Sequence, residues 1–151
     1  MKVYLATDHA GFELKEKVKD FLIKEGYELE DCGAYELDPD DDYPDFISKA
    51  AKKVSQDPGS FGVIFGGSGQ GEAMVANKFP NVQAAVYYGK VEEMPALTRQ
   101  HNDSNILSLG ARFLTADEAN SAVKLFLETS FTNEERHARR IEKIKAIESK
   151  P

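Results

Sequence analysis

Cysteine is almost absent from the 151-residue chain, which contains only Cys32. A lone cysteine cannot form an internal disulfide, so the chain is no disulfide-rich extracellular scaffold and suits a reducing cytoplasm. Long apolar runs are also missing, since no stretch approaches the roughly 20 residues that a membrane span requires. Residues 1–4 (Met-Lys-Val-Tyr) indicate the start of a strand rather than a signal peptide. We therefore expect a cytoplasmic protein without a membrane partner.

Basic residues are outnumbered, with 19 Lys and Arg against 26 Asp and Glu and a formal net charge of −7. This deficit argues against a general affinity for nucleic acid or for anionic membranes. Internal repeats and low-complexity segments are absent as well. The length and a 41% hydrophobic content suit one domain with a substantial core. We predict a single domain over residues 1–151.

Short apolar segments alternate along the chain with segments of helical periodicity. The predicted strands cover residues 2–7, 27–32, 61–65, 82–88 and 105–109. The predicted helices cover residues 14–25, 44–54, 72–78, 94–100, 115–127 and 133–149. Alternation of this kind predicts an α/β fold, a three-layer αβα sandwich around a five-stranded parallel, Rossmann-like sheet with a C-terminal helical extension.

Local signals refine these boundaries. Thr115 with Glu118, and Thr132 with Glu135, each have the spacing of a capping box at the start of a helix. The acidic loop 38–42 resembles the opening of a calcium-binding loop, but its sixth and twelfth positions are tyrosine and lysine instead of glycine and glutamate. We interpret that loop as solvated.

A glycine-rich turn, residues 66–71, follows the third predicted strand and leads into a helix that begins near Glu72. Glu72 stands where a phosphate-binding P-loop has lysine, Met74 where a dinucleotide fingerprint has its third glycine, and Gln70 where a hydrolase elbow has glycine. None of these three motifs fits, so the turn is left as a group of backbone N–H donors beside a carboxylate. That combination suits removal of a proton from carbon next to a developing oxyanion. A purely structural turn is the alternative.

Other polar residues follow the predicted strands directly. Asp8 and His9 come after the first strand, and Arg112 comes after the fifth. Because ligands of open parallel sheets bind at the carboxyl ends of strands, we expect these side chains to converge on the glycine turn. Asp8 taken alone is more typical of a helix cap.

Two further groups are expected at the other edge of the sheet. His101 and Asn102 precede the fifth strand, so within one chain they lie away from Glu72. They are either structural or brought to the site by a second subunit. Arg136 and Arg140 share one helical face and could clasp a phosphate, although a solvated basic face is the simpler interpretation.

Several motifs together resemble one known family. They are the segments 8–11 (Asp-His-Ala-Gly), 42–45 (Asp-Tyr-Pro-Asp), 67–71, 76–78 (Ala-Asn-Lys), 101–102 and the pair Arg136 and Arg140. Their order and spacing are similar to those of the type B ribose-5-phosphate isomerases, a family that includes galactose-6-phosphate isomerase subunits. The resemblance implies interconversion of ribose 5-phosphate and ribulose 5-phosphate through a cis-enediolate, without metal or organic cofactor. A hexose 6-phosphate of the allose or galactose type is the alternative substrate.

The resemblance also implies residue roles. Many members have a cysteine base where this chain has Gly66, whereas a second subgroup uses a glutamate at the position of Glu72. His101 would open the sugar ring, with Ser68 as a further catalytic residue near the sugar hydroxyls. The implied phosphate ligands are His9, Arg112, Arg136 and Arg140. The other implied substrate-binding residues are Asp8, Tyr43, Gly67, Gly69, Gln70, Gly71 and Asn102.

The resemblance further implies a homodimer or tetramer with shared active sites, in which the C-terminal helix, about residues 133–149, packs on a partner subunit.

Two other classes of function stay open. One is a hydrolase that uses Ser68 with Asp103 and His137, in the order serine, aspartate, histidine. The other is a non-catalytic sugar-phosphate-binding subunit of the same fold.

Overall fold

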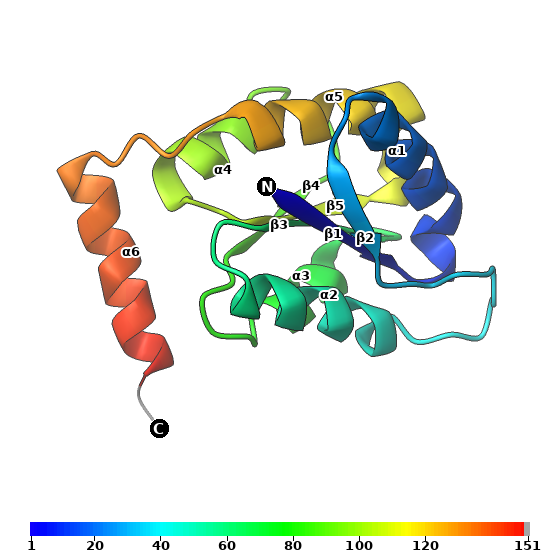
Figure 1. Cartoon of the computed structure of the whole chain (residues 1–151), viewed down its shortest axis with the longest axis horizontal. Helices are drawn as coiled ribbons and strands as arrows, with labels where there is room; N and C mark the ends of the chain where they lie inside the picture. The colour runs from blue at the N-terminus through cyan, green and yellow to red at the C-terminus, as the bar shows by residue number, and fades with distance from the viewer. Residues whose placement is uncertain (150–151) are drawn as a thin grey trace.

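The computed structural model describes residues 1–149 and is built around one five-stranded parallel sheet (Figure 1). The strands are β1 (Lys2–Thr7), β2 (Glu28–Asp31), β3 (Phe61–Gly66), β4 (Ala84–Tyr87) and β5 (Ile106–Gly110). The helices are α1 (Phe12–Lys24), α2 (Pro44–Gln56), α3 (Gln70–Ala76), α4 (Met94–Asn102), α5 (Ala116–Glu128) and α6 (Glu135–Glu148). Short 3₁₀ turns, η1 (His9–Gly11) and η2 (Ala111–Phe113), follow β1 and β5.

The period-2 alternation of the strands divides the core into two layers. On β1, Val3 and Leu5 pack with residues of α1 and α5, whereas Tyr4 and Ala6 pack with residues of α2. Figure 1 shows α1, α4 and α5 above the sheet and α2 and α3 below it. The predicted three-layer αβα sandwich is confirmed.

The strand order β2-β1-β3-β5-β4 places the topological switch point between β1 and β3. After β1 the chain continues to the neighbouring strand on one side of β1, and it later returns to β3 on the other side of β1. The connections that leave β1 and β3 therefore run in opposite directions. A crevice at the carboxyl ends of the strands is the usual ligand site of such sheets. The residues after β1, the glycine turn after β3 and η2 after β5 all lie at this C-terminal edge.

Tertiary contacts move some predicted boundaries. β4 begins at Ala84, two residues later than predicted, where the Asn77 side chain accepts a bond from the Ala84 N–H (2.8 Å) and donates to its carbonyl (3.1 Å). The capping box of Thr115 and Glu118 is confirmed at the start of α5. The second box is wrong. The Thr132 hydroxyl donates to the carbonyl of residue 100 at the end of α4, and α6 begins without a side-chain cap.

A buried lysine fixes the end of β2. The Lys15 side chain is fully buried in α1, and its ammonium donates to both carboxylate oxygens of Asp31, at 2.8 and 2.7 Å, and to the Ala34 carbonyl at 2.7 Å. Burial would raise the pKa of Asp31, but bonds from Lys15 and the Gly33 N–H hold it below its usual range. The pair anchors the segment that leads from β2 to α2.

The last helix, α6, stands apart from the sheet in Figure 1 and is joined to α5 by an extended connector. Ile141 is buried, but Ile144 is 47% exposed and Ile147 is 68% exposed. The predicted C-terminal helical extension is confirmed, with bounds 135–148 in place of 133–149. Among the described residues, no helix combines the length and apolar character needed to cross a membrane.

Candidate active site

Glu72 lies in the first turn of α3, which begins directly after Gly69. Gly69 has φ of +82°, a left-handed conformation that glycine adopts without strain, and this turns the chain into the helix. The Glu72 side chain is turned inward and only 4% of the residue is exposed. A Cβ added at Gly66 would overlap its carboxylate. The absence of a side chain at position 66 therefore makes room for the carboxylate at the end of β3.

The surroundings of Glu72 favour its protonated form. Burial raises the pKa of the Glu72 carboxyl above its ordinary value, and the negative charge of Asp8 adds to the rise. The residue's own backbone N–H opposes the shift in pKa without cancelling it. A carboxyl group whose pKa is moved toward neutrality is better suited to exchange a proton with carbon than an ordinary surface carboxylate is.

The segment after β1 brings an acid and a histidine to the same edge. Asp8 caps η1, where its carboxylate accepts bonds from the N–H groups of Ala10 (3.0 Å) and Gly11 (3.4 Å). The capping role expected for Asp8 is thus present. His9 contacts Asp41: Nδ1 lies 2.7 Å from the carboxylate, and the His9 N–H donates to the same oxygen at 3.0 Å.

Asp8, His9 and Asp41 are also the group in the described residues that comes nearest to a metal site. One ligand atom from each lies within 4.8 Å of the others. However, Nδ1 of His9 is already paired with Asp41, and one Asp8 oxygen caps η1. These contacts account for the His9 and Asp8 side chains without a cation, whereas Oδ2 of Asp41 is buried without a partner in the described residues.

The glycine turn is bordered by two long side chains. The Arg112 N–H donates to the Gly67 carbonyl at 3.1 Å, and a Cβ added at Gly67 would lie 2.9 Å from Nη1 of Arg112. A Cβ added at Gly71 would lie 2.5 Å from the Tyr43 hydroxyl. The turn therefore has an arginine on one side and a phenol on the other, and glycine is needed for both to approach.

The remaining residues of the turn face outward. Ser68 and Gln70 are exposed, and the Ser68 hydroxyl accepts a weak bond from the Gln70 N–H at 3.4 Å. The Gly69 carbonyl, by contrast, is held inside the protein by the Ser108 hydroxyl at 2.7 Å. The C-terminal edge thus presents an open surface over a buried carboxylate.

The second group of predicted residues lies at the opposite edge, as expected. His101 and Asn102 end α4 just before β5, and both are exposed. Arg136 and Arg140 are exposed on α6, which contacts the body of the protein through α4. Within one chain these four residues do not reach Glu72, because the length of β5 separates the two edges.

His137 was assigned a role only in the hydrolase alternative, and in the structure it is buried. Its ring stacks on that of His101, with centroids 4.5 Å apart and planes 17° apart. Burial lowers the pKa of His137, and the charge of Arg136 lowers it further. The stack joins α4 to α6 and fixes the position of His101. The one sequence signal for this burial was spacing: His137 lies four residues before Ile141 and therefore on the same inward face of the helix.

The hydrolase alternative does not assemble within one chain. Ser68 contacts the C-terminal end of β5 near Gly110, whereas Asp103 precedes the start of that strand. At about 3.3 Å per residue, a five-residue strand separates them by roughly 15 Å. His137 lies with α4 at the same far edge as Asp103. Ser68, His137 and Asp103 therefore do not form a hydrogen-bonded set within one chain.

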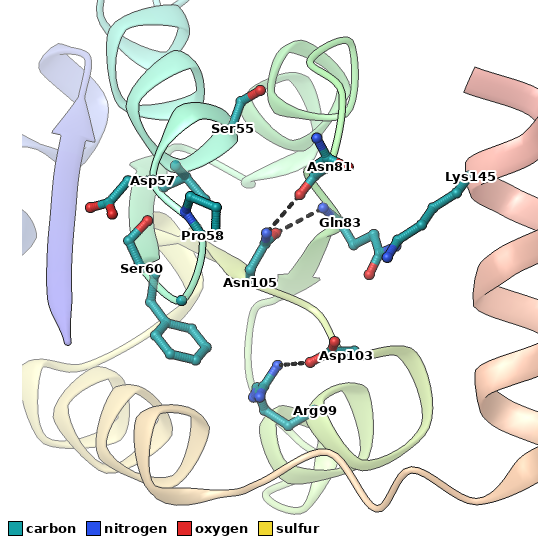
Figure 2. A pocket seen from close by; sticks show the side chains of 13 residues that line it. Ser55, Asp57, Pro58, Ser60, Asn81, Gln83, Arg99, Asp103, Asn105 and Lys145 are labelled. Carbon is teal, nitrogen blue, oxygen red and sulfur yellow. Dashed lines mark hydrogen bonds and ion pairs between the residues drawn. The ribbon is translucent and has the colours of Figure 1, made fainter. Parts of the chain in front are cut away.

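A cavity of about 490 Å³ also lies at the far edge, between the end of α2 and Lys145 of α6 (Figure 2). Several of its polar side chains already have partners within the protein. The Asn105 amide donates to the Asn81 carbonyl and accepts from the Gln83 N–H, and Arg99 pairs with Asp103, whereas the Ser60 hydroxyl has no partner in the described residues. Such mutual pairing leaves few groups free for a ligand.

Comparison with known proteins agrees with the resemblance seen in the motifs. Residues 3–144 match the family described as Ribose/Galactose Isomerase. The chain is 43% identical over 142 residues to ribose-5-phosphate isomerase B of Mycobacterium tuberculosis (strain H37Rv), an alignment that covers 94% of this chain and 86% of the relative. It is 33% identical to ribose-5-phosphate isomerase B of Escherichia coli (strain K12) over 149 residues, covering 99% and 97%.

Solved structures are similar over nearly the whole chain. The crystal structure of ribose-5-phosphate isomerase B from Mycoplasma genitalium with bound ribulose-5-phosphate has a TM-score of 0.94 at 36% identity, covering 99% of this chain and 97% of that one. The Clostridium thermocellum ribose-5-phosphate isomerase B has a TM-score of 0.92 at 40% identity, covering 98% and 97%. The fold prediction is thereby confirmed beyond the sheet itself.

Proposed function

The chain belongs to the ribose/galactose isomerase family and is an isomerase of the ribose-5-phosphate type, and we propose that it acts through a cis-enediolate with Glu72 as the base. The observation that carries this proposal is the Glu72 carboxylate, buried in the space above Gly66 beside the glycine turn. Where many relatives of this type would have a cysteine side chain, this chain has a carboxylate from the next helix.

The chemistry follows from the position of that carboxylate. Glu72 removes the proton from C2 of the open-chain aldose phosphate, and the electron pair forms the C1–C2 double bond of the enediolate. The N–H groups of the turn, residues 67–71, stabilise the oxyanion. Glu72 then returns the proton to C1 while a proton passes from the oxygen on C2 to the oxygen on C1, which gives the ketose phosphate. Because one group accepts and donates the proton, a raised pKa assists both steps.

The phosphate is the second recognition element. We assign it to His9 and Arg112, which lie at the same edge as Glu72, together with Arg136 and Arg140 of a partner subunit. Arginine suits this task because its planar guanidinium binds phosphate oxygens in pairs. Asp8, Tyr43 and Gln70 border the turn and are assigned to the sugar, with Ser68 near its hydroxyls.

The partner would also supply the ring-opening residues. His101, oriented by His137, and Asn102 are exposed at the edge away from their own Glu72. In a twofold dimer, each subunit can present this edge to the open C-terminal edge of the other. The active unit is then a homodimer or a tetramer of such dimers, with residues 133–149 packing on the partner.

Ribose 5-phosphate is the proposed substrate because the relatives and the solved structures described above are named ribose-5-phosphate isomerase B. The bound ligand of the Mycoplasma genitalium enzyme is ribulose-5-phosphate. A hexose 6-phosphate of the allose or galactose type differs by one carbon unit and is the alternative. The second alternative is a sugar-phosphate-binding subunit without activity, because this chain lacks the more common cysteine base and has Glu72 in its place.

An isomerase assay across ribose, allose and galactose phosphates tests this proposal. We expect turnover of ribose 5-phosphate and exchange of its C2 hydrogen with solvent deuterium. Exchange of the C2 hydrogen without net turnover would show that the chain removes this proton, and loss of the exchange in Glu72→Gln would identify Glu72 as the base. Binding of ribose 5-phosphate without turnover and without exchange would refute the enzyme and favour the non-catalytic subunit.

A further inference from the structure

The acidic loop 38–42 contains one residue that is not solvated, contrary to the interpretation of the whole loop from sequence. Asp38, Asp40 and Asp42 are exposed, whereas the Asp41 side chain is only 6% exposed. Its Oδ1 accepts the backbone N–H of His9 at 3.0 Å and lies 2.7 Å from Nδ1 of the ring. A loop 32 residues away in sequence thus holds the histidine that follows β1.

We propose that Asp41 is a positioning residue for His9, which it holds through Nδ1 so that Nε2 is the nitrogen left to meet the anionic end of the substrate. This inference rests on the proposed function, in which His9 binds the phosphate. One carboxylate oxygen fixes both the backbone and the ring of His9. A carboxylate can only accept, so it also fixes the tautomer, with the Nδ1 proton directed at Asp41.

Asp41 has no other side-chain task in the described part of the chain. Both hydrogen bonds of its carboxylate go to His9 through Oδ1, and Oδ2 is buried without a partner among residues 1–149. A carboxylate retained only for folding would be expected to have both oxygens satisfied. Its partners point to His9 as the reason for its burial.

The charge around His9 supports this role. The hydrogen bond that the His9 ring donates to Asp41 raises the pKa of His9 above its ordinary value, and the negative charge of Asp8 adds to the rise. Burial and the positive charge of Arg112 act in the opposite direction on the pKa, but the net shift is upward. His9 therefore keeps its positive charge to higher pH than a free histidine, beside the arginine of the same site.

The test measures His9 directly. The pKa of its imidazole is followed by NMR in the ligand-free protein, with the signal assigned from the His9→Gln variant. We expect Asp41→Asn to lower this pKa by about one unit, since a charged hydrogen-bond partner is lost. Asp40→Asn is the matched control, because it removes the same charge one residue away from an exposed position, and should leave the His9 pKa nearly unchanged.

Binding of anions provides a second readout. Asp41→Asn should raise KM for ribose 5-phosphate and Ki for inorganic phosphate about fivefold near neutral pH, with kcat nearly unchanged. The loss should grow as pH rises through the range in which the variant's His9 is neutral and the wild-type residue is still charged. Asp41→Glu keeps the carboxylate and should recover most of both the pKa and the affinity.

The outcomes separate this inference from the proposed function. An equal His9 pKa in the wild type and Asp41→Asn would overturn the positioning role, as would a loss of phosphate affinity of the same size at every pH. If Asp41→Asn does not fold, the Asp41→Glu variant decides, and a His9 pKa near that of free histidine in that variant contradicts the inference. If Asp41→Asn lowers the His9 pKa but the wild type has no isomerase activity, the positioning role of Asp41 is upheld and the proposed function is refuted.

Discussion

The two edges of the sheet differ in how their polar residues are held. At the C-terminal edge, Glu72 and Asp8 are buried, and their positions follow from strand ends that the core fixes. At the other edge, His101, Arg136 and Arg140 are exposed, and His101 stacks on the buried His137. One edge is arranged around a buried carboxylate, and the other carries cations and a histidine that are exposed to solvent.

From this difference we infer two half-sites that one chain cannot join. The C-terminal edge has the buried carboxylate proposed as the base, under an open surface, and the other edge has the exposed arginines proposed to bind the phosphate. Chemistry that needs both requires a second copy of the chain. The following changes test this division, beginning with the largest expected effect.

The loss of the proposed base should affect the reaction most. Glu72→Gln keeps the shape of the side chain but cannot accept a proton, so kcat should fall about a hundredfold or more, with KM for ribose 5-phosphate largely unchanged. Steady-state assays measure both. Glu128→Gln, an exposed change at the end of α5, is the control. Near-normal turnover of Glu72→Gln would place the base elsewhere.

Mixing two inactive variants tests whether the site is shared. If Glu72 of one subunit works with His101 of the other, then a dimer of Glu72→Gln and His101→Asn chains contains one intact site and one doubly altered site. Equal mixing, by co-expression or by refolding together, should recover roughly a quarter of wild-type activity. No recovery above the separate variants, in a mixture shown to contain mixed dimers, would mean that each chain works alone.

The interior contacts of the C-terminal edge should matter for stability. Lys15→Met leaves the buried charge of Asp31 without its main partner and should lower the free energy of unfolding by about 3–5 kcal/mol. Urea denaturation at fixed protein concentration measures it. Lys19→Met is the control, because Lys19 pairs with the same carboxylate from a position that is 31% exposed and should cost about 0–1 kcal/mol. Equal effects would mean that burial of the lysine is unimportant.

The raised pKa of Glu72 predicts the smallest of these effects, a displaced pH profile. Below its pKa the Glu72 carboxyl carries a proton and cannot act as base. The acid limb of the kcat/KM profile should therefore lie above pH 4.5, the ordinary pKa of a glutamate side chain. Removing the negative charge of Asp8 with Asp8→Asn should move the limb to lower pH. A limb that stays in place in this variant would show that Asp8 does not act on the base.

Much of the molecule could be predicted because its signals are local. Period-2 strands, helical stripes and the glycine turn gave the sandwich, the parallel sheet and the candidate base, and the Thr115 cap was found where its spacing placed it. The errors involve side chains used by distant segments. The Thr132 hydroxyl bonds α4 in place of capping α6, and Asp41, interpreted as solvated, is buried against His9.

The sequence by itself determined the order of strands and helices and which residues follow strand ends, since these depend on neighbours within a few positions. Only the tertiary structure decided that a carboxylate fits into the space that Gly66 leaves, that Lys15 lies buried against Asp31, and that His101 stacks on His137. Each of these depends on segments far apart in the chain meeting at one point, and no local pattern specifies where such segments meet.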